Sequence, residues 1–468
     1  MENLKKRASL KLPARAGIWS VLSGLVARGV GVVGTPIFTR LLTPAEYGLY
    51  PLYTTWLSLF TALFSTALTG SVIYRGLQKF KDCKERFTSA ASGLGLSVAL
   101  MLFIIGIPLS PLLEGLTGLG SGILMIMIAE IALSTVISVR SSALRYEYSY
   151  KRLALINLIS AIGAPSISVL IVIATPYHAE ARIIGSMMTS VAVAIPILAG
   201  MRSGARLFDK EIWGYLIRAC LPILPHCIAS SLILRISETV IGRTHGEAAL
   251  AKYSVGLSVG LALTFLSNAL GGASSPWILR KIAGGEQERV KEMLTLMHAA
   301  LISASALILC LAPEILSVIT PPEYADALPT VYPLTLTVPL MLLSNSIIAA
   351  EAYYERRAAA SLPTVLTALL SGLAALLILP RVDYRFSALF TLGAYLLLLS
   401  LSHLTYRKIS GNSILDIRKC ILLFAFGGIY AILAFALREV LISRIILVTP
   451  ILPLVILLGR KVYKRIKE

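Results

Sequence analysis

The sequence predicts an all-α protein that crosses a membrane many times, and three observations lead to this class. Of the 468 residues, 56% are hydrophobic and only 14% are charged, and the mean hydropathy is +0.80. A soluble chain carries about 25% charged residues. The apolar residues form runs of about 20, the length of a helix that spans a bilayer. The basic residues gather in the short connections between these runs.

Windowed hydropathy predicts about fourteen spans. They cover approximately residues 16–38, 47–73, 87–109, 122–139, 153–174, 183–200, 213–241, 250–271, 293–319, 327–350, 358–379, 387–404, 421–437 and 441–458. No connection is long enough for a separate catalytic domain. No Ser/His/Asp set, paired carboxylates or Gly-rich phosphate loop stands in a plausible place, so we expect the protein not to be an enzyme.

The basic residues predict how these spans are oriented. With fourteen spans, 32 of the 43 lysines and arginines lie on the side of the N-terminus, 8 lie on the opposite side and 3 lie within spans. Such a bias is what the positive-inside rule predicts if both termini are cytoplasmic. The net charge of +19 therefore reflects membrane topology, and we expect no nucleic-acid partner.

The first predicted span and the hairpin after it form the most informative stretch. Arg28 stands about halfway along residues 16–38, and a charge inside the membrane is a functional-site hypothesis by default. Thr43 and Glu46 fit an S/T-x-x-E capping box with Pro44 at the first helical position, which predicts that a helix begins there. Residues 320–324 repeat this capping pattern later in the chain.

The hairpin R-L-L-T-P-A-E-Y-G at residues 40–48 resembles the polysaccharide-transport family of the MATE-like MOP superfamily, which contains flippases of O-antigen and lipid-linked oligosaccharides. The resemblance implies a MATE-like fold with two six-helix lobes plus two C-terminal helices. We place the lobes at residues 1–208 and 209–411 and the added helices at 412–468. A faint repeat of the 38–49 hairpin at residues 241–255 agrees with paired lobes.

The resemblance also implies a function. The expected substrate is a polyprenyl-pyrophosphate oligosaccharide, moved by alternating access across the inner membrane without a cofactor. Membrane lipids and other polysaccharide-assembly membrane proteins are the expected partners. A cation-coupled multidrug exporter of the same superfamily and a peptidoglycan-precursor lipid flippase remain open as alternatives. The glycan, the coupling ion and the oligomeric state leave no trace in the sequence.

Charged residues within the spans are the candidate site residues. Arg28 offers a fork of donors suited to phosphate, either for substrate or in an ion pair with Glu130, near the middle of the fourth span. Arg235 is deep in the seventh span and either lines a cavity or pairs locally with Glu238.

Three further groups are given lesser roles. Arg218 shares the seventh span with Arg235 but is close enough to its end to extend to the interface. Arg75, at the predicted cytoplasmic end of the second span, is a candidate guide for a phosphate head group. Tyrosines near span ends, such as Tyr50 and Tyr53, are interpreted as an aromatic belt. The five histidines and five cysteines have no metal-ligand spacing, so we expect no metal site.

Overall fold

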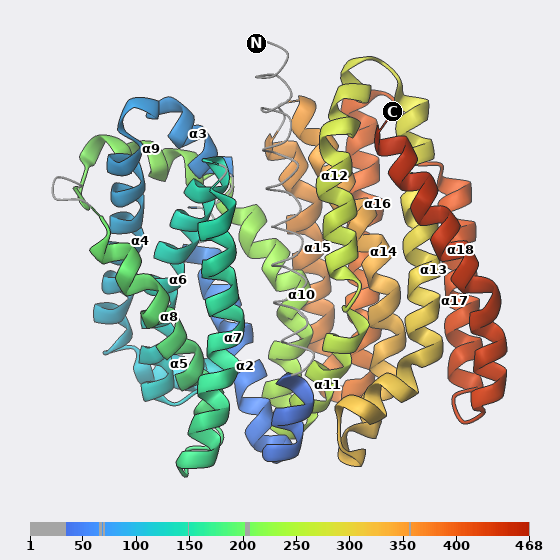
Figure 1. Ribbon diagram of the computed structural model, residues 1–468, viewed down its shortest axis with the longest axis horizontal. Coiled ribbons are helices and arrows are strands. Elements are labelled where there is room, and N and C mark those ends of the chain that lie inside the picture. Colours follow the sequence, from blue (N-terminus) through green and yellow to red (C-terminus); the bar gives the residue numbers. More distant parts are fainter. Residues whose placement is uncertain are drawn as a thin grey trace. The chain divides into compact units, whose positions relative to one another are not determined.

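The computed structural model describes residues 34–64, 68, 71–147, 149–201, 206–354 and 357–467 (Figure 1). All regular secondary structure in these residues is helical, which confirms the predicted all-α class. The chain forms two compact units, Met1–Ser231 and Leu232–Glu468, and the division falls within helix α10 (Leu224–Thr244). The division into lobes at residues 208/209 and 411/412 stays a prediction.

The described helices of the first unit come before α10 in the chain. They are α2 (Pro44–Phe64), α3 (Ser71–Lys79), α4 (Lys84–Gly106), α5 (Ser110–Thr117), α6 (Ser121–Tyr146), α7 (Tyr150–Ala174), α8 (Ala181–Ala199) and α9 (Lys210–Cys220), with the 3-10 turn η2 (Lys81–Cys83) before α4. Helix α6 packs against α2, α4, α7 and α8, so side chains from several helices meet along it. This central position of α6 brings the candidate site together.

Helix α2 begins where the sequence predicts. Thr43 N donates to Glu46 Oε2 at 2.8 Å, and Glu46 N donates back to Thr43 Oγ1 at 3.3 Å, which completes the capping box. Pro44 is the first residue of the helix, where its missing N–H has no cost. The second predicted capping box, at residues 320–324, does not form. The Thr320 hydroxyl donates to the Leu316 carbonyl, and η3 (Pro322–Ala327) begins without a side-chain cap.

The predicted seventh span is broken into two helices. Helix α9 ends at Cys220 and α10 begins at Leu224, with a turn between them. Pro222 in this turn has no N–H to continue the helical hydrogen bonding, and Pro225 follows in the first turn of α10. Arg218 and Arg235 therefore lie on different helices, contrary to the prediction that they share one.

The described part of the second unit contains the rest of α10 and eight further helices. They are α11 (Gly246–Gly260), α12 (Thr264–Ala283), α13 (Gln287–Ile319), α14 (Leu328–Glu351), α15 (Arg357–Ile378), α16 (Ser387–Ser410), α17 (Ile417–Ala436) and α18 (Leu441–Lys467). Short 3-10 turns accompany them: η4 (Ala352–Tyr354), η5 (Leu379–Arg381) and η6 (Tyr384–Phe386). Helices α11 and α12 bend by 44° at their junction, so the predicted span 250–271 is bent.

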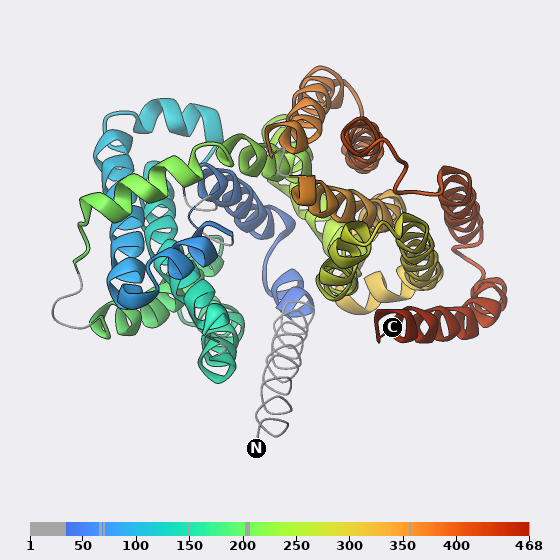
Figure 2. The ribbon, with the colours of Figure 1, turned by 90° about the horizontal axis from the view of Figure 1, so that it is seen from above.

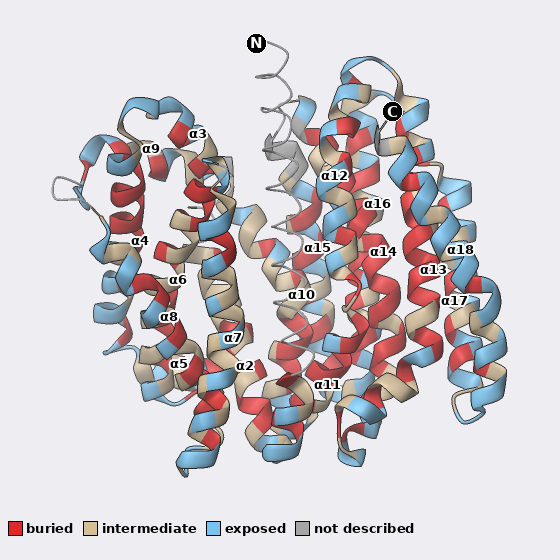
Figure 3. Cartoon of the chain, viewed as in Figure 1, coloured by how far each residue is buried: buried red, intermediate tan, exposed pale blue. Residues whose placement is uncertain are grey.

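Helices α13 and α14 form the centre of the second unit, and their most apolar segments are largely buried (Figure 3). Helices α17 and α18 pack on α13 at the edge of the same unit and expose large apolar side chains (Figure 2). Near one end of α18, the buried Arg444 forms an ion pair with Glu314 and donates to the Cys310 carbonyl at 3.1 Å. This pair holds α18 on α13.

Eleven described helices are long and apolar enough to cross a membrane, or twelve if α11 and α12 form one bent span. The predicted count of fourteen is therefore not confirmed. Of the two remaining predicted spans, residues 16–38 fall almost entirely outside the described residues. The other corresponds to α2 and the start of α3, and α2 is not among the eleven. The chain is a multi-pass membrane protein.

Candidate functional site

The candidate site of the first unit is a polar cluster around Glu130 on α6. The Glu130 side chain is buried, and hydroxyl groups from two other helices donate to its carboxylate. Tyr53 on α2 donates to Oε2, and Ser186 on α8 donates to Oε1 at 2.5 Å, with Ser190 one turn further on at 3.5 Å. Both carboxylate oxygens thus accept hydrogen bonds from hydroxyl groups.

Arg182 lies in the first turn of α8, one helical turn before Ser186. Its guanidinium carbon stands 3.9 Å from the centre of the Tyr50 ring and 4.8 Å from the rings of Phe38 and Tyr47. These contacts are cation–π interactions, each of which stabilises a desolvated cation by about 2 kcal/mol or more. The Arg182 Nη1 atom is buried and has no hydrogen-bond partner among the described residues.

The cluster therefore contains the Glu130 carboxyl group of α6 and the Arg182 guanidinium of α8, and both contact α2. Tyr50 and Tyr53 come from one face of α2 and contact Arg182 and Glu130, respectively. A carboxylate surrounded by hydroxyl groups can accept a proton or bind a cation, while a guanidinium with an unused N–H can donate to an oxyanion. The chemistry available here is reversible binding of charge.

Arg235 and Glu238 form an ion pair on α10 in the second unit. Arg235 Nη1 lies 2.6 Å from Glu238 Oε2, and the Glu238 side chain is only 2% exposed. The i,i+3 spacing on α10 places both groups on one face, as the sequence suggests. Next to Glu238 in the chain, Ser237 contacts Thr391 of α16 at 3.2 Å, and the buried Tyr253 of α11 contacts the same Thr391 oxygen at 3.2 Å.

The other predicted site residues are not part of these clusters. Arg75 is exposed on α3, a helix of nine residues. Arg28 lies outside the described residues, so its predicted contact with Glu130 or with substrate stays a prediction. Arg235, Glu130 and Glu238 make the contacts described above. Their predicted roles in substrate binding or ion coupling stay predictions.

A basic cavity opens elsewhere in the first unit. It has a volume of about 340 Å³ and is lined by α4, α6, α7 and α8. Arg140 and Arg152 contribute cationic side chains to it, and Glu85 contributes an acidic one. All three residues belong to connections or helix ends that the charge bias predicts to be cytoplasmic. An anionic group approaching from that side would meet these charges first.

Of the Glu130 cluster, sequence reasoning identified only Glu130 itself as a site residue, and it misplaced Arg182 and Tyr53. Arg182 directly precedes the predicted span 183–200, so the fourteen-span topology places it in a connection on the side opposite the N-terminus, yet it stacks on aromatic rings inside the first unit. Tyr53 was assigned to an aromatic belt, and this is wrong because its side chain is fully buried against Glu130. The one signal available was spacing: Tyr50 and Tyr53 are three residues apart and Arg182 and Ser186 four apart, so each pair shares a helix face.

The fold is similar to those of solved transporters of the MOP superfamily. The chain matches the lipid II flippase MurJ in an inward closed conformation at 12% identity and a TM-score of 0.73, over 96% of this chain and all of that one. An inward-facing multidrug resistance MATE family transporter matches at 13% identity and a TM-score of 0.59, over 88% and 96% of the two chains.

A MOP superfamily transporter from Pyrococcus furiosus matches at 13% identity and a TM-score of 0.54, over 90% of this chain and 96% of that one. At such identities these matches show the fold alone. No curated protein matches the chain.

The fold and the charged groups inside its helices define a polytopic membrane protein of the MATE-like class. A family model described as polysaccharide biosynthesis protein matches residues 14–281, which is more than half of the chain. The chain belongs to this family of polysaccharide biosynthesis proteins. This confirms the resemblance noted at the hairpin of residues 40–48.

Proposed function

We propose that the protein is a flippase that moves a polyprenyl-pyrophosphate oligosaccharide across the inner membrane by alternating access, for polysaccharide or O-antigen biosynthesis. The observation that carries the proposal is the family match over residues 14–281, together with a fold shared with a lipid II flippase. The protein is not an enzyme in this proposal, and both of its termini are cytoplasmic. Other polysaccharide-assembly membrane proteins are its proposed partners.

The charges described above support an anionic substrate. Arg182 carries a buried N–H without an acceptor among the described residues, and Arg140 and Arg152 line a cavity on the predicted cytoplasmic side. Cationic groups lower the cost of taking a pyrophosphate out of water, while the lipid tail stays in the bilayer. The intramembrane Arg28 would add to this potential.

Two rival functions have specific support. A peptidoglycan-precursor flippase is favoured by the match to MurJ, and a multidrug exporter by the matches to MATE transporters. An exporter of cations needs a carboxylate that is available to its substrate. Glu238 is paired with Arg235, whereas Glu130 has hydroxyl partners and no ion-pair partner among the described residues. Glu130 is therefore the residue on which the exporter hypothesis depends.

The test is transport by the purified full-length protein in liposomes. Three labelled substrates are compared: a polyprenyl-pyrophosphate oligosaccharide, lipid II and a lipophilic cation. We expect movement of the oligosaccharide lipid and its loss in Arg28→Ala, with Arg407→Ala as a control at an exposed cation. Movement of the lipophilic cation alone would establish the exporter, and movement of lipid II alone would establish the peptidoglycan-precursor flippase.

A further inference from the structure

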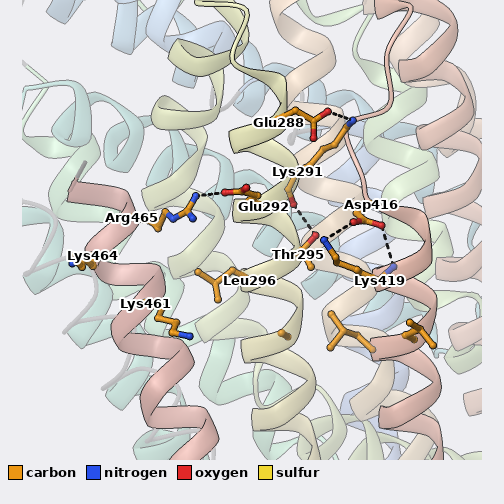
Figure 4. A pocket seen from close by; sticks show the side chains of 13 residues that line it. Glu288, Lys291, Glu292, Thr295, Leu296, Asp416, Lys419, Lys461, Lys464 and Arg465 are labelled. Atoms are coloured by element: carbon orange, nitrogen blue, oxygen red, sulfur yellow. Dashed lines mark hydrogen bonds and ion pairs between the residues drawn. The ribbon is translucent and has the colours of Figure 1, made fainter.

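A pocket of about 820 Å³ in the second unit has no role in the function proposed above. It is lined by the first turns of α13 and α17 and the last turns of α18, and Figure 4 shows α13 with α18 on one side and α17 on the other. The three helix ends lie in connections that the charge bias assigns to the cytoplasmic side. The pocket therefore lies at the level of the inner leaflet's head groups.

The pocket has an excess of positive charge. Each of its three acidic residues forms an ion pair with a basic one: Glu288 with Lys291 at 2.5 Å, Asp416 with Lys419 at 2.9 Å, and Glu292 with Arg465 at 2.5 Å. Lys461 and Lys464 also line the pocket, and neither has an ion-pair partner within the part of the chain that the structure describes. Two cations are thus left to attract an anion.

The wall beyond the charged residues is apolar. One turn further along α13 and α17, the pocket is lined by Leu296, Leu422 and Leu423. The Leu422 side chain is 69% exposed and continues into an apolar surface of α17 that a lipid would cover. Lys461 extends from α18 toward α13 and lies beside this apolar wall, lower than Leu296 in the view of Figure 4. A ligand that fits both parts is anionic at one end and apolar at the other.

We propose that this pocket binds an anionic phospholipid of the inner leaflet, distinct from the transported substrate. Lys461 and Lys464 hold the phosphate, and the acyl chains lie along the leucines of α13 and α17. Basic pockets between transmembrane helices on the cytoplasmic side are suited to anionic head groups, and the inner leaflet supplies them. A soluble polyanion would leave the exposed leucines uncovered, so the combination of groups favours a lipid.

The test is lipid retention by the full-length protein, measured by native mass spectrometry after exchange into phosphatidylglycerol and phosphatidylcholine in equal amounts. We expect the native protein to retain phosphatidylglycerol preferentially. Lys461→Gln/Lys464→Gln should lower this affinity about 30-fold, or about 2 kcal/mol at 1.4 kcal/mol per factor of ten, because each basic residue contributes about 1 kcal/mol. Arg407→Gln/Lys408→Gln is the matched control, since both residues are exposed at the end of α16.

A second variant addresses the apolar half of the pocket. Leu422→Asn removes lipid contact at an exposed position, so it should weaken phosphatidylglycerol binding without affecting the fold, which gel filtration checks. Equal retention by the native protein and both pocket variants would overturn the proposal, and so would an equal loss in the control. Preferential binding of a polyprenyl phosphate, or of inorganic phosphate with the same affinity, would also overturn it.

Discussion

The hydrogen bond between Tyr53 and Glu130 gives a quantitative test of the candidate site. Tyr53→Phe removes one hydroxyl group and leaves the ring packed as it is. The bond is buried, and the carboxylate accepts at both oxygens, from Tyr53 on one side and Ser186 on the other. If Glu130 is ionised, the lost bond is charge-assisted, and its removal leaves a buried acceptor without its donor.

The magnitude follows from the charge of the acceptor. A hydrogen bond to a charged group contributes about 1.5–3 kcal/mol. A neutral hydrogen bond inside a membrane protein averages about 0.6 kcal/mol. Tyr53→Phe should therefore cost about 1.5–3 kcal/mol in the native protein and about 0.6 kcal/mol in a Glu130→Gln background, where the amide oxygen still accepts.

The assay is reversible unfolding of the four proteins of this cycle in detergent, at neutral pH. Ser190→Ala is the matched control, because its hydroxyl is 3.5 Å from Glu130 and should contribute almost nothing. An equal cost of Tyr53→Phe in both backgrounds would refute the reasoning, because Glu130 would then not be a charged acceptor for this tyrosine.

The remaining predictions concern other charged groups. Arg235→Ala should destabilise the protein by about 3–5 kcal/mol because it leaves Glu238 buried and unpaired. In unfolding measurements, Arg235→Ala/Glu238→Gln should recover most of this lost stability. No recovery would show that the two residues are not coupled. Burial by itself raises the pKa of Asp209, but hydrogen bonds from Arg86 and from the Ile212 N–H outweigh it and lower that pKa. A carboxyl group with a lowered pKa in the folded state contributes stability above about pH 4, and this contribution is lost as the pH falls further. The stabilities of the native and Asp209→Asn proteins should therefore converge in acid. A difference in stability that stays constant with pH would contradict this. Reporter fusions after Arg86 and after Glu468 should both report the cytoplasm, and an external signal at either would disprove the predicted topology.

The sequence by itself determined the class of the protein and some of its local structure. The length of the apolar runs and the positions of the basic residues are properties of contiguous segments, so they predict a polytopic helical protein without knowledge of packing. The start of α2 was predictable because a capping box involves only Thr43 and Glu46, three residues apart. The local spacing of Arg235 and Glu238 likewise suggested their ion pair.

Only the tertiary structure decided which polar groups meet. Glu130 is 77 residues from Tyr53 and 56 residues from Ser186, and Arg182 stacks on Tyr50 from another helix. In a membrane helix the side chains that face lipid are as apolar as those that face other helices, so periodicity does not reveal which face is buried. Tyr53 could therefore be read as interfacial and Arg182 as external, until the packing of α2, α6 and α8 placed both inside the first unit.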